Sequence, residues 1–326
     1  MGDGGFANRA RGRVLSVSES PVLAREELRR AALDRDTAVC IGVFDGVHRG
    51  HRYLIGRMVE RGRRERLGTM VVTFHPHPRL VVQPQASLTY LCGLEERIEL
   101  LRELGVDSVA ILTFTSELAQ LSAREFASLL VEELRMKLLV VGSDFALGRG
   151  READARALEA IGREMGFAVE EVALLKVGEE KVGSSATRLA LARGDMETVA
   201  SLLGRPFLLR GPIVRGAERG RSLGFPTANI ALGLDRALPA FGVYVTRAYV
   251  GGAAYPAVTN IGLRPTFDED TPTVETYILD FQGEVRGEEL RIELLHRLRG
   301  EMRFPDADAL KEQIEKDVAA TRAYLS

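Results

Sequence analysis

The sequence reads Ile41-Gly42-Val43-Phe44-Asp45-Gly46-Val47-His48-Arg49-Gly50-His51 at the point that decides its fold. An apolar run over residues 39–44 meets a turn, and a helix is predicted over residues 52–66. A helix N-terminus offers unpaired backbone N–H groups and a partial positive charge, so it attracts phosphate. His48 and His51 stand at this opening and can donate hydrogen bonds to a phosphoryl group as charge builds on it. The stretch therefore predicts a strand, a phosphate-binding turn and a helix.

A second pair of histidines follows another predicted strand. His75 and His77 come in Thr73-Phe74-His75-Pro76-His77-Pro78, directly after the strand-like residues 69–74. Two strand ends that both present histidines indicate one site at the carboxyl edge of a parallel sheet, where α/β folds bind ligands. The alternative for each histidine is helix capping or plain exposure to solvent.

Short apolar runs alternate with helical patterns through the first half of the chain. The strand-like runs cover residues 39–44, 69–74, 108–113, 138–141 and 168–172. The helical patterns cover residues 52–66, 94–104, 123–134 and 153–165, and two short helices are expected over 184–192 and 195–203. This order predicts βαβ units and an α/β, doubly wound parallel sheet, which we place in a domain of residues 1–203.

The texture changes after about residue 203. Strand-like runs cover residues 207–214, 242–250, 253–260, 273–281 and 290–298, with glycines and prolines between them. Gly251-Gly252 joins two of these runs and is typical of a hairpin, and Asp306 can cap a last helix over residues 307–325. We therefore expect a second domain, residues 204–326, built as a small antiparallel β-barrel with a C-terminal helix.

Composition limits the class of protein. At 326 residues, 45% apolar and 28% charged, the chain is ordinary for a globular protein of two domains. Its formal charge of −2 argues against nucleic acid as the main partner. Cys40 and Cys92 are too few for a disulfide framework, residues 1–14 do not resemble a signal peptide, and no apolar run approaches a membrane span. We expect a soluble cytoplasmic protein that acts on small molecules and has no membrane partner.

Further segments of the first half suit phosphate. Gly46 and Gly50 let backbone and ligand approach closely. Residues 140–151 form a third strand end with a glycine-rich turn, which can hold a nucleotide or is merely a solvated loop. The helix expected over residues 184–192 begins with two serines and an arginine that suit triphosphate oxygens, namely Ser184, Ser185 and Arg188. A serine at the start of a helix is, however, often only a cap.

The second half contains a separate phosphate-binding pattern without a Walker-type motif. Glycines recur after its first strand and allow a loop to wrap phosphates; they are Gly211, Gly216, Gly220 and Gly224. Thr227 and Asn229 offer neutral oxygens on one side of an extended segment, as Mg²⁺ held beside ATP phosphates requires. Glu275, inside an apolar strand, is a candidate general base. The alternative is a glutamate on the wet face of its sheet.

From about residue 39 to residue 325, the order of these motifs resembles the bacterial bifunctional riboflavin kinase/FMN adenylyltransferases, or FAD synthetases. The resemblance rests on residues 42–51, 73–78, 211–229 and 260–267, on Glu275 and the strand after it, and on Leu298-Arg299-Gly300-Glu301 with Phe304. It implies further nucleotide-binding residues at Gly42, Phe44, Asp45 and Pro226. It implies flavin-binding residues at His75, Pro76, His77, Asp144, Phe145, Arg299 and Glu301.

The chain departs from the family pattern at several positions. Ala146-Leu147 stands where an aromatic residue is usual, so we expect an aromatic contact to the flavin to be missing and FMN to bind more weakly. Gly183, Val43 and Arg286 also replace residues that are common in the family.

The resemblance implies two reactions, with ATP as co-substrate of both. The barrel would phosphorylate riboflavin to FMN, with Glu275 taking the proton from the ribityl hydroxyl beside Mg²⁺. The first domain would adenylylate FMN to FAD and pyrophosphate, with His48 and His51 stabilising the α-phosphate. Two alternatives stay open: a nucleotidyltransferase for another substrate, and a riboflavin kinase or flavin-binding paralogue with weakened adenylylation. The sequence leaves the oligomeric state open.

Overall fold

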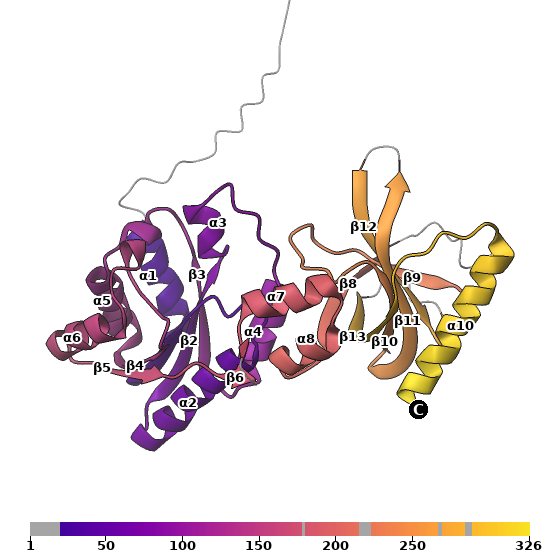
Figure 1. The fold of residues 1–326 in the computed structure, drawn as a ribbon. Coiled ribbons are helices and arrows are strands. Elements are labelled where there is room, and N and C mark those ends of the chain that lie inside the picture. Colours follow the sequence, from indigo (N-terminus) through magenta and orange to yellow (C-terminus); the bar gives the residue numbers. More distant parts are fainter. Residues whose placement is uncertain (1–19, 178–179, 215–222, 267–268, 284–288) are drawn as a thin grey trace, which may run out of the picture. The chain divides into compact units, whose positions relative to one another are not determined.

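The computed structural model describes residues 20–177, 180–214, 223–266, 269–283 and 289–326 (Figure 1). They form two compact units that no single cut in the sequence separates. The sheet unit contains the described residues up to Val43, with Arg57–Ala86 and Gly105–Val172. The barrel unit contains Phe44–Gly56, Ser87–Leu104 and the described residues from Ala173 onward.

The sheet unit is built on five parallel strands in the order β3-β2-β1-β4-β5, which confirms the predicted doubly wound sheet. The strands are β1 (Thr37–Ile41), β2 (Gly68–His75), β3 (Ser108–Thr113), β4 (Met136–Gly142) and β5 (Ala168–Val172). Every residue of β1 is buried, as expected of a strand that helices cover on both faces.

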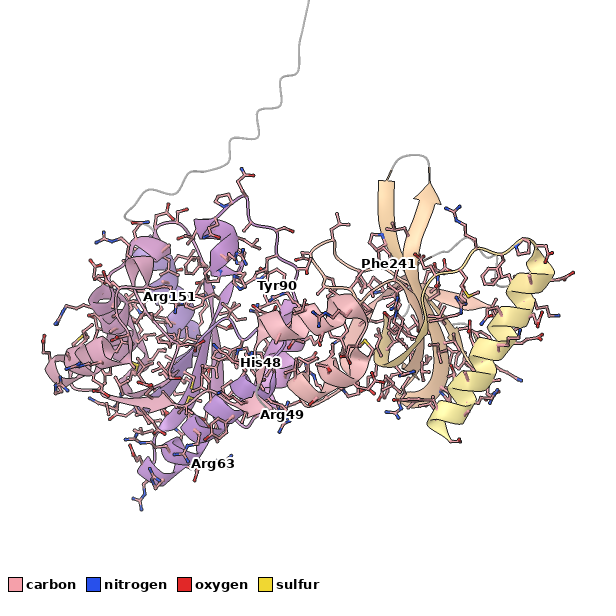
Figure 2. The ribbon with its side chains drawn as sticks, viewed as in Figure 1. His48, Arg49, Arg63, Tyr90, Arg151 and Phe241 are labelled. Carbon is pink, nitrogen blue, oxygen red and sulfur yellow. The ribbon has the colours of Figure 1, made fainter. Side chains whose placement is uncertain are left out.

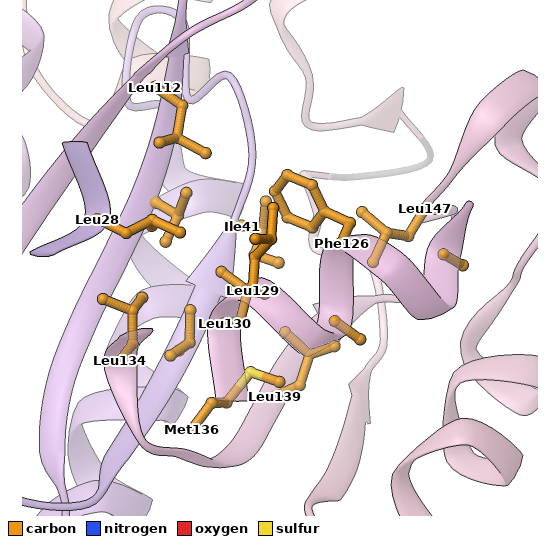
Figure 3. Close-up of a cluster of buried hydrophobic side chains, with 14 of the residues drawn as sticks. Leu28, Ile41, Leu112, Phe126, Leu129, Leu130, Leu134, Met136, Leu139 and Leu147 are labelled. Atoms are coloured by element: carbon orange, nitrogen blue, oxygen red, sulfur yellow. The ribbon is translucent and has the colours of Figure 1, made fainter. Parts of the chain in front are cut away.

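Helices pack on both faces of β1. One face carries a large apolar cluster with side chains from α1 (Ser20–Ala31), α5 (Ala123–Leu134) and α6 (Ala155–Met165), part of which Figure 3 shows. On the other face lies α2 (Arg49–Glu65), where a Cβ added at Gly62 would lie 2.5 Å from Thr69 Cγ2. Helix α1 was not predicted from the sequence, and neither was the short α3 (Pro78–Val82).

The junction between β1 and α2 differs from the expected one. The strand ends at Ile41 rather than residue 44, and the helix begins at Arg49 rather than residue 52. Phe44, Gly46 and Val47 have φ of 53°, 77° and 39°, and a strand cannot continue through such backbone. As a result His48 lies just before the helix and His51 lies inside its first turn.

The barrel unit contains a closed antiparallel barrel in the order β10-β11-β12-β9-β8-β13, as predicted. Its strands are β8 (Phe207–Val214), β9 (Thr227–Ile230), β10 (Gly242–Val250), β11 (Ala253–Thr266), β12 (Glu269–Ile278) and β13 (Glu289–Arg299). Gly251 and Gly252, with φ of 55° and 82°, form the predicted hairpin between β10 and β11. The unit also contains α4 (Leu94–Arg102) and the small hairpin β6 (Lys176–Val177) and β7 (Glu180–Lys181).

Two helices share the core of the barrel. These are α7 (Ser184–Arg193) and α8 (Met196–Leu203), which lie beside the barrel in Figure 1. Leu191 and Met196 belong to the same buried cluster as Phe207 and Tyr244 of β8 and β10. The predicted domain boundary near residue 203 therefore falls inside a compact unit.

The C-terminal helix α10 (Ala307–Leu325) lies along the outside of the barrel, and Asp306 caps it as predicted by accepting the Ala309 N–H at 2.8 Å (Figure 1). Val318 packs against Val243, Val258 and Leu279 there. No helix in the described part of the chain is both long and apolar enough to cross a membrane.

Candidate functional site

The turn after β1 holds two stacked imidazoles. The ring centroids of His48 and His51 lie 3.5 Å apart with an interplanar angle of 20°, and the edge of Phe44 meets His51 at 5.1 Å. His48 is only 6% exposed, and its Nδ1 accepts the backbone N–H of His51 at 3.3 Å. Figure 2 marks His48 where the turn leads into α2. The two predicted histidines thus form one packed pair.

The His51 ring of this pair is uncharged at neutral pH. Burial lowers the pKa of His51 well below its usual value, and the nearby His48 and Arg97 lower it further. A neutral imidazole carries a single N–H donor. The His51 ring therefore offers a hydrogen-bond donor rather than a full positive charge.

The glycines of this turn make room for protein atoms. A Cβ at Gly50 would lie 3.1 Å from His48 Nδ1 and 3.2 Å from His48 Cε1. At Gly46, where φ is 77°, it would lie 3.0 Å from Leu91 Cβ. Gly50 thus allows the His48 ring to lie against the start of α2. Protein atoms therefore fill space that the glycines were predicted to leave for a ligand.

Three residues predicted to bind nucleotide contact one another. The buried carboxylate of Asp45 pairs with Arg188 and accepts the backbone N–H of Leu91 at 3.0 Å. Arg188 also donates to the Thr89 carbonyl at 2.8 Å, and the Ser184 hydroxyl donates to the Asp45 carbonyl at 3.0 Å. These contacts hold the turn against the first turn of α7. Ser185, one residue along, is exposed.

The other predicted residues of the first half lie at the carboxyl edge of the sheet. Gly42 follows β1, His75 ends β2 with Pro76 and His77 after it, and Asp144 and Phe145 follow β4; these three strands are neighbours. His77 caps α3, since its Nδ1 accepts the Arg79 N–H at 3.0 Å. The Asp144 carbonyl accepts a hydrogen bond from Arg151 at 2.8 Å.

Leu147 is a core residue. It is 8% exposed and belongs to the buried cluster that includes Phe126 and Leu129 (Figure 3). Its backbone exchanges hydrogen bonds with Ala153 at 2.9 and 3.1 Å. The burial of Leu147 favours a packing role at this position, and the weaker binding of FMN stays a prediction.

The kinase residues predicted in the barrel share its outer face. Glu275 pairs in register with Asn229 on β9 and with Asn260 on β11, and Tyr277 pairs with Thr227. Side chains alternate along a strand, and Val274 and Ile278 belong to the core inside the barrel. Glu275 therefore points outward between two asparagines.

A carboxylate from the C-terminal segment adds to this face. A Cβ at Gly262 would collide with Glu301 Oε1 and would lie 3.8 Å from Asn260 Nδ2. Glu301 thus lies over β11 beside Asn260. Asn260 lies in the motif of residues 260–267, but the sequence assigned it no role. Its position beside Glu275 follows from the pairing of β11 with β12. Arg299, predicted to bind flavin, forms a double ion pair with buried Asp317 of α10, at 2.8 to 3.2 Å.

The glycine-rich loop of residues 211–224 is described only in part, because Gly216 and Gly220 lie outside the described residues. Arg286, further along the chain, also lies outside them. Gly211 lies in β8, where an added Cβ would collide with the backbone of Ala231, so its role in the structure is close strand packing. Gly224 is exposed with φ of 89°. Pro226 follows it directly before β9.

No group of three or more His, Cys, Asp or Glu side chains among the described residues is arranged to hold a metal ion. Thr227 and Asn229 supply only neutral oxygens, which suits a Mg²⁺ ion that takes its remaining ligands from phosphates and water.

Two protein-family models match successive parts of this chain. The FAD synthetase family model matches residues 30–186, and the riboflavin kinase model matches residues 203–325. The bifunctional riboflavin kinase/FMN adenylyltransferase of Escherichia coli strain K12 is 39% identical over 287 residues, which is 87% of this chain and 91% of that protein. Its counterpart in Bacillus subtilis strain 168 is 35% identical over 298 residues, 89% of this chain and 93% of that protein.

A solved structure is similar over nearly the whole chain. It is described as a macrolide-efflux protein from Streptococcus pneumoniae, and it matches with a TM-score of 0.84 at 30% identity, covering 90% of this chain and 96% of that one. With both family models in order and relatives of this identity along its length, the chain belongs to the bifunctional riboflavin kinase/FMN adenylyltransferase family.

Proposed function

We propose that this enzyme carries out its two reactions at two separate groups of residues. The row Asn229, Glu275 and Asn260 on the outer face of the barrel would phosphorylate riboflavin to FMN. The stacked pair of His48 and His51 would serve the adenylylation of FMN to FAD and pyrophosphate. The single observation that carries the proposal is the placement of half-buried Glu275 between Asn229 and Asn260 on the outer face of the barrel.

At the kinase site, we assign Glu275 as the general base. It would take the proton from the ribityl hydroxyl as the oxygen attacks the γ-phosphate of ATP and the bond from that phosphate to the departing ADP breaks. Thr227 and Asn229 would hold Mg²⁺ with ATP phosphate oxygens, and the ion would neutralise charge on the transferred group. Their register opposite Tyr277 and Glu275 supports this assignment, because all four side chains share one face. Glu301, from the segment after β13, lies over β11 nearby and is our candidate for the flavin side.

At the adenylyltransferase site, the FMN phosphate is already a nucleophile, so no base is needed. His48 and His51 would donate to the α-phosphate of ATP while charge builds on it. The carboxyl edge of the sheet, with His75, His77 and Asp144, is the proposed place for the flavin.

We assign adenylylation to residues 1–203 and phosphorylation to residues 204–326. The ranges of the two family models, 30–186 and 203–325, support this assignment. Free, buried Cys40 and Cys92 fit a reducing cytoplasm.

The test uses full-length protein with riboflavin, ATP and Mg²⁺, followed by separation of riboflavin, FMN and FAD. Glu275→Gln should lower FMN formation by about 10²-fold and leave adenylylation of added FMN unchanged. Glu293→Gln is the matched control, because this glutamate lies on β13 rather than β12 and accepts a hydrogen bond from the Tyr249 hydroxyl of β10 at 2.9 Å. Replacing His48 or His51 by Ala should lower FAD formation by about 10²–10³-fold while FMN accumulates. Near-normal FMN formation by Glu275→Gln would remove Glu275 from the mechanism.

A further inference from the structure

Both polar groups of the Gly46 peptide are held by distant segments. Its N–H donates to Cys92 Sγ at 3.1 Å, and its carbonyl accepts Arg205 Nη2 at 3.0 Å. Gly46 has a φ of 77° and stands two residues before His48. The position of the His48 turn therefore depends on the donor that meets this carbonyl.

Arg205 belongs to a buried charged chain. Its guanidinium lies 3.9 Å from Glu96 Oε1, and Glu96 Oε2 lies 3.1 Å from Arg236 Nη2. Arg236 also donates to the Leu208 carbonyl and lies over the Phe207 ring at 5.2 Å from its centroid. The chain Gly46–Arg205–Glu96–Arg236 thus runs from the turn to the first strand of the barrel. We call it the turn clamp.

The charges of the turn clamp are largely shielded from water, although the Arg205 side chain is 20% exposed. The side chains of Glu96 and Arg236 are 9% and 8% exposed. Burial raises the pKa of Glu96, which Arg236 and Arg205 oppose, and burial lowers the pKa of Arg205. Removing one partner of such a group leaves the others unpaired, so the remaining residues must move. The movement would reach Gly46, because Arg205 is bound to it directly.

The turn clamp joins the two halves of the sequence. Gly46 and Glu96 lie in the range that the FAD synthetase model matches, 30–186, whereas Arg205 and Arg236 lie in the riboflavin kinase range, 203–325. We propose that Arg205 is a positioning residue for adenylyl transfer, which fixes the turn that presents His48 and His51. This inference rests on the proposed function of those two histidines.

The proposal predicts which kinetic constant changes. Arg205 acts on the position of His48, so its loss lowers kcat for FAD formation and leaves the KM for FMN nearly unchanged. Displacement of a reacting group by about 1 Å costs about 10²-fold, and we expect a loss of about 10- to 100-fold for Arg205→Met. Riboflavin phosphorylation by the same sample stays at the wild-type rate.

The experiment compares full-length variants with FMN, ATP and Mg²⁺. Arg205→Lys keeps one charged donor and should recover part of the lost kcat. Arg210→Met is the matched control: Arg210 also joins β8 to α4, through Glu99 at 3.1 and 3.2 Å, but on an exposed surface away from the turn. Its FAD formation should equal that of the wild type. Should Arg205→Met lose both activities, Arg205→Lys decides: reduced kcat for FAD with intact phosphorylation supports the proposal, and equal losses overturn it.

A double variant tests the route through His48. Arg205→Met should lower kcat in the wild-type background and lower it little further in His48→Ala, because the group that it positions is already absent. Equal fold-losses in both backgrounds would overturn the route. A wild-type rate for Arg205→Met beside an impaired His48→Ala overturns this inference alone. A wild-type rate for His48→Ala overturns the proposed function as well.

Discussion

Replacing Gly50 by Ala should impair adenylylation without unfolding the protein. Gly50 is the second residue of α2, and an added Cβ would meet His48 Nδ1 at 3.1 Å and Cε1 at 3.2 Å. His48 cannot simply swing away, because it is 6% exposed and stacked on His51 at 3.5 Å. The ring must therefore shift together with its partner.

The size of the effect follows from that contact. A comfortable carbon contact needs about 3.5 Å, so the ring must move by about 0.4 Å. If a displacement of about 1 Å costs about 10²-fold, a shift of this size costs about sixfold in kcat for FAD formation. Alanine favours a helix over glycine by up to about 1 kcal/mol, which offsets the strain, so the free energy of unfolding should change by less than about 1 kcal/mol.

Gly56 provides the matched control in the same helix. An added Cβ there meets nothing within 4 Å, so Gly56→Ala should stabilise the protein by about 0.5–1 kcal/mol and leave both activities unchanged. Steady-state kinetics with FMN, riboflavin kinase assays and thermal unfolding distinguish the two variants. A wild-type kcat for FAD formation in Gly50→Ala would refute the argument that the position of His48 limits the rate.

Three further predictions concern the stability and reactivity of the chain. A fragment of residues 204–326 should be less stable than one of residues 184–326 by about 5 kcal/mol or more, since α7 and α8 share the barrel core; equal urea midpoints would contradict this. The pKa of His51 is lowered in the folded protein, so below about pH 6.5 the unfolded chain binds a proton that the folded one does not. Stability should then fall with decreasing pH by up to about 1.4 kcal/mol per unit, and less steeply in His51→Asn; the same slope in both proteins would be the opposing result. Burial raises the pKa of Cys40, and that of Cys92 to about 12, so neither thiol should react with Ellman's reagent at pH 8 until the protein unfolds; prompt labelling of the native protein would show that one is accessible.

Apolar runs in the sequence located most of the strands. Residues 108–113 and 207–214 coincide with β3 and β8, whereas β9 was predicted only as an extended segment. The sequence also predicted that polar residues after different strands lie at one edge of the sheet, because parallel strands bring their carboxyl ends together there. Helix α1 was missed, although Ala24 and Leu28 stand four positions apart and form its buried face. The positive φ values of Phe44 and Val47 were not visible either, since both residues continue an apolar run.

Residue type alone did not separate packing from ligand binding. Leu147 lies within a glycine-rich turn and a family motif, yet it packs with Phe126 in the core. Gly211 lies within a predicted phosphate loop, yet it admits the backbone of Ala231. In both cases the sequence placed the residue near a predicted site. What the residue contacts depends on how the following segment folds back against it.

The turn clamp is the clearest case of a feature that the sequence could not show. Arg205 stands 159 positions after the carbonyl that it holds, and no spacing or periodicity links the two residues. Arginine is also common in this chain, which has 44 Lys and Arg in all, so neither Arg205 nor Arg236 stands out as buried. Arg236 and Arg205 meet Glu96 of α4 only in the folded chain, where this buried carboxylate needs partners inside the protein. If the clamp acts as proposed, the adenylyltransferase turn depends on residues in the kinase half of the sequence. A cut between the halves would then separate His48 from part of what positions it.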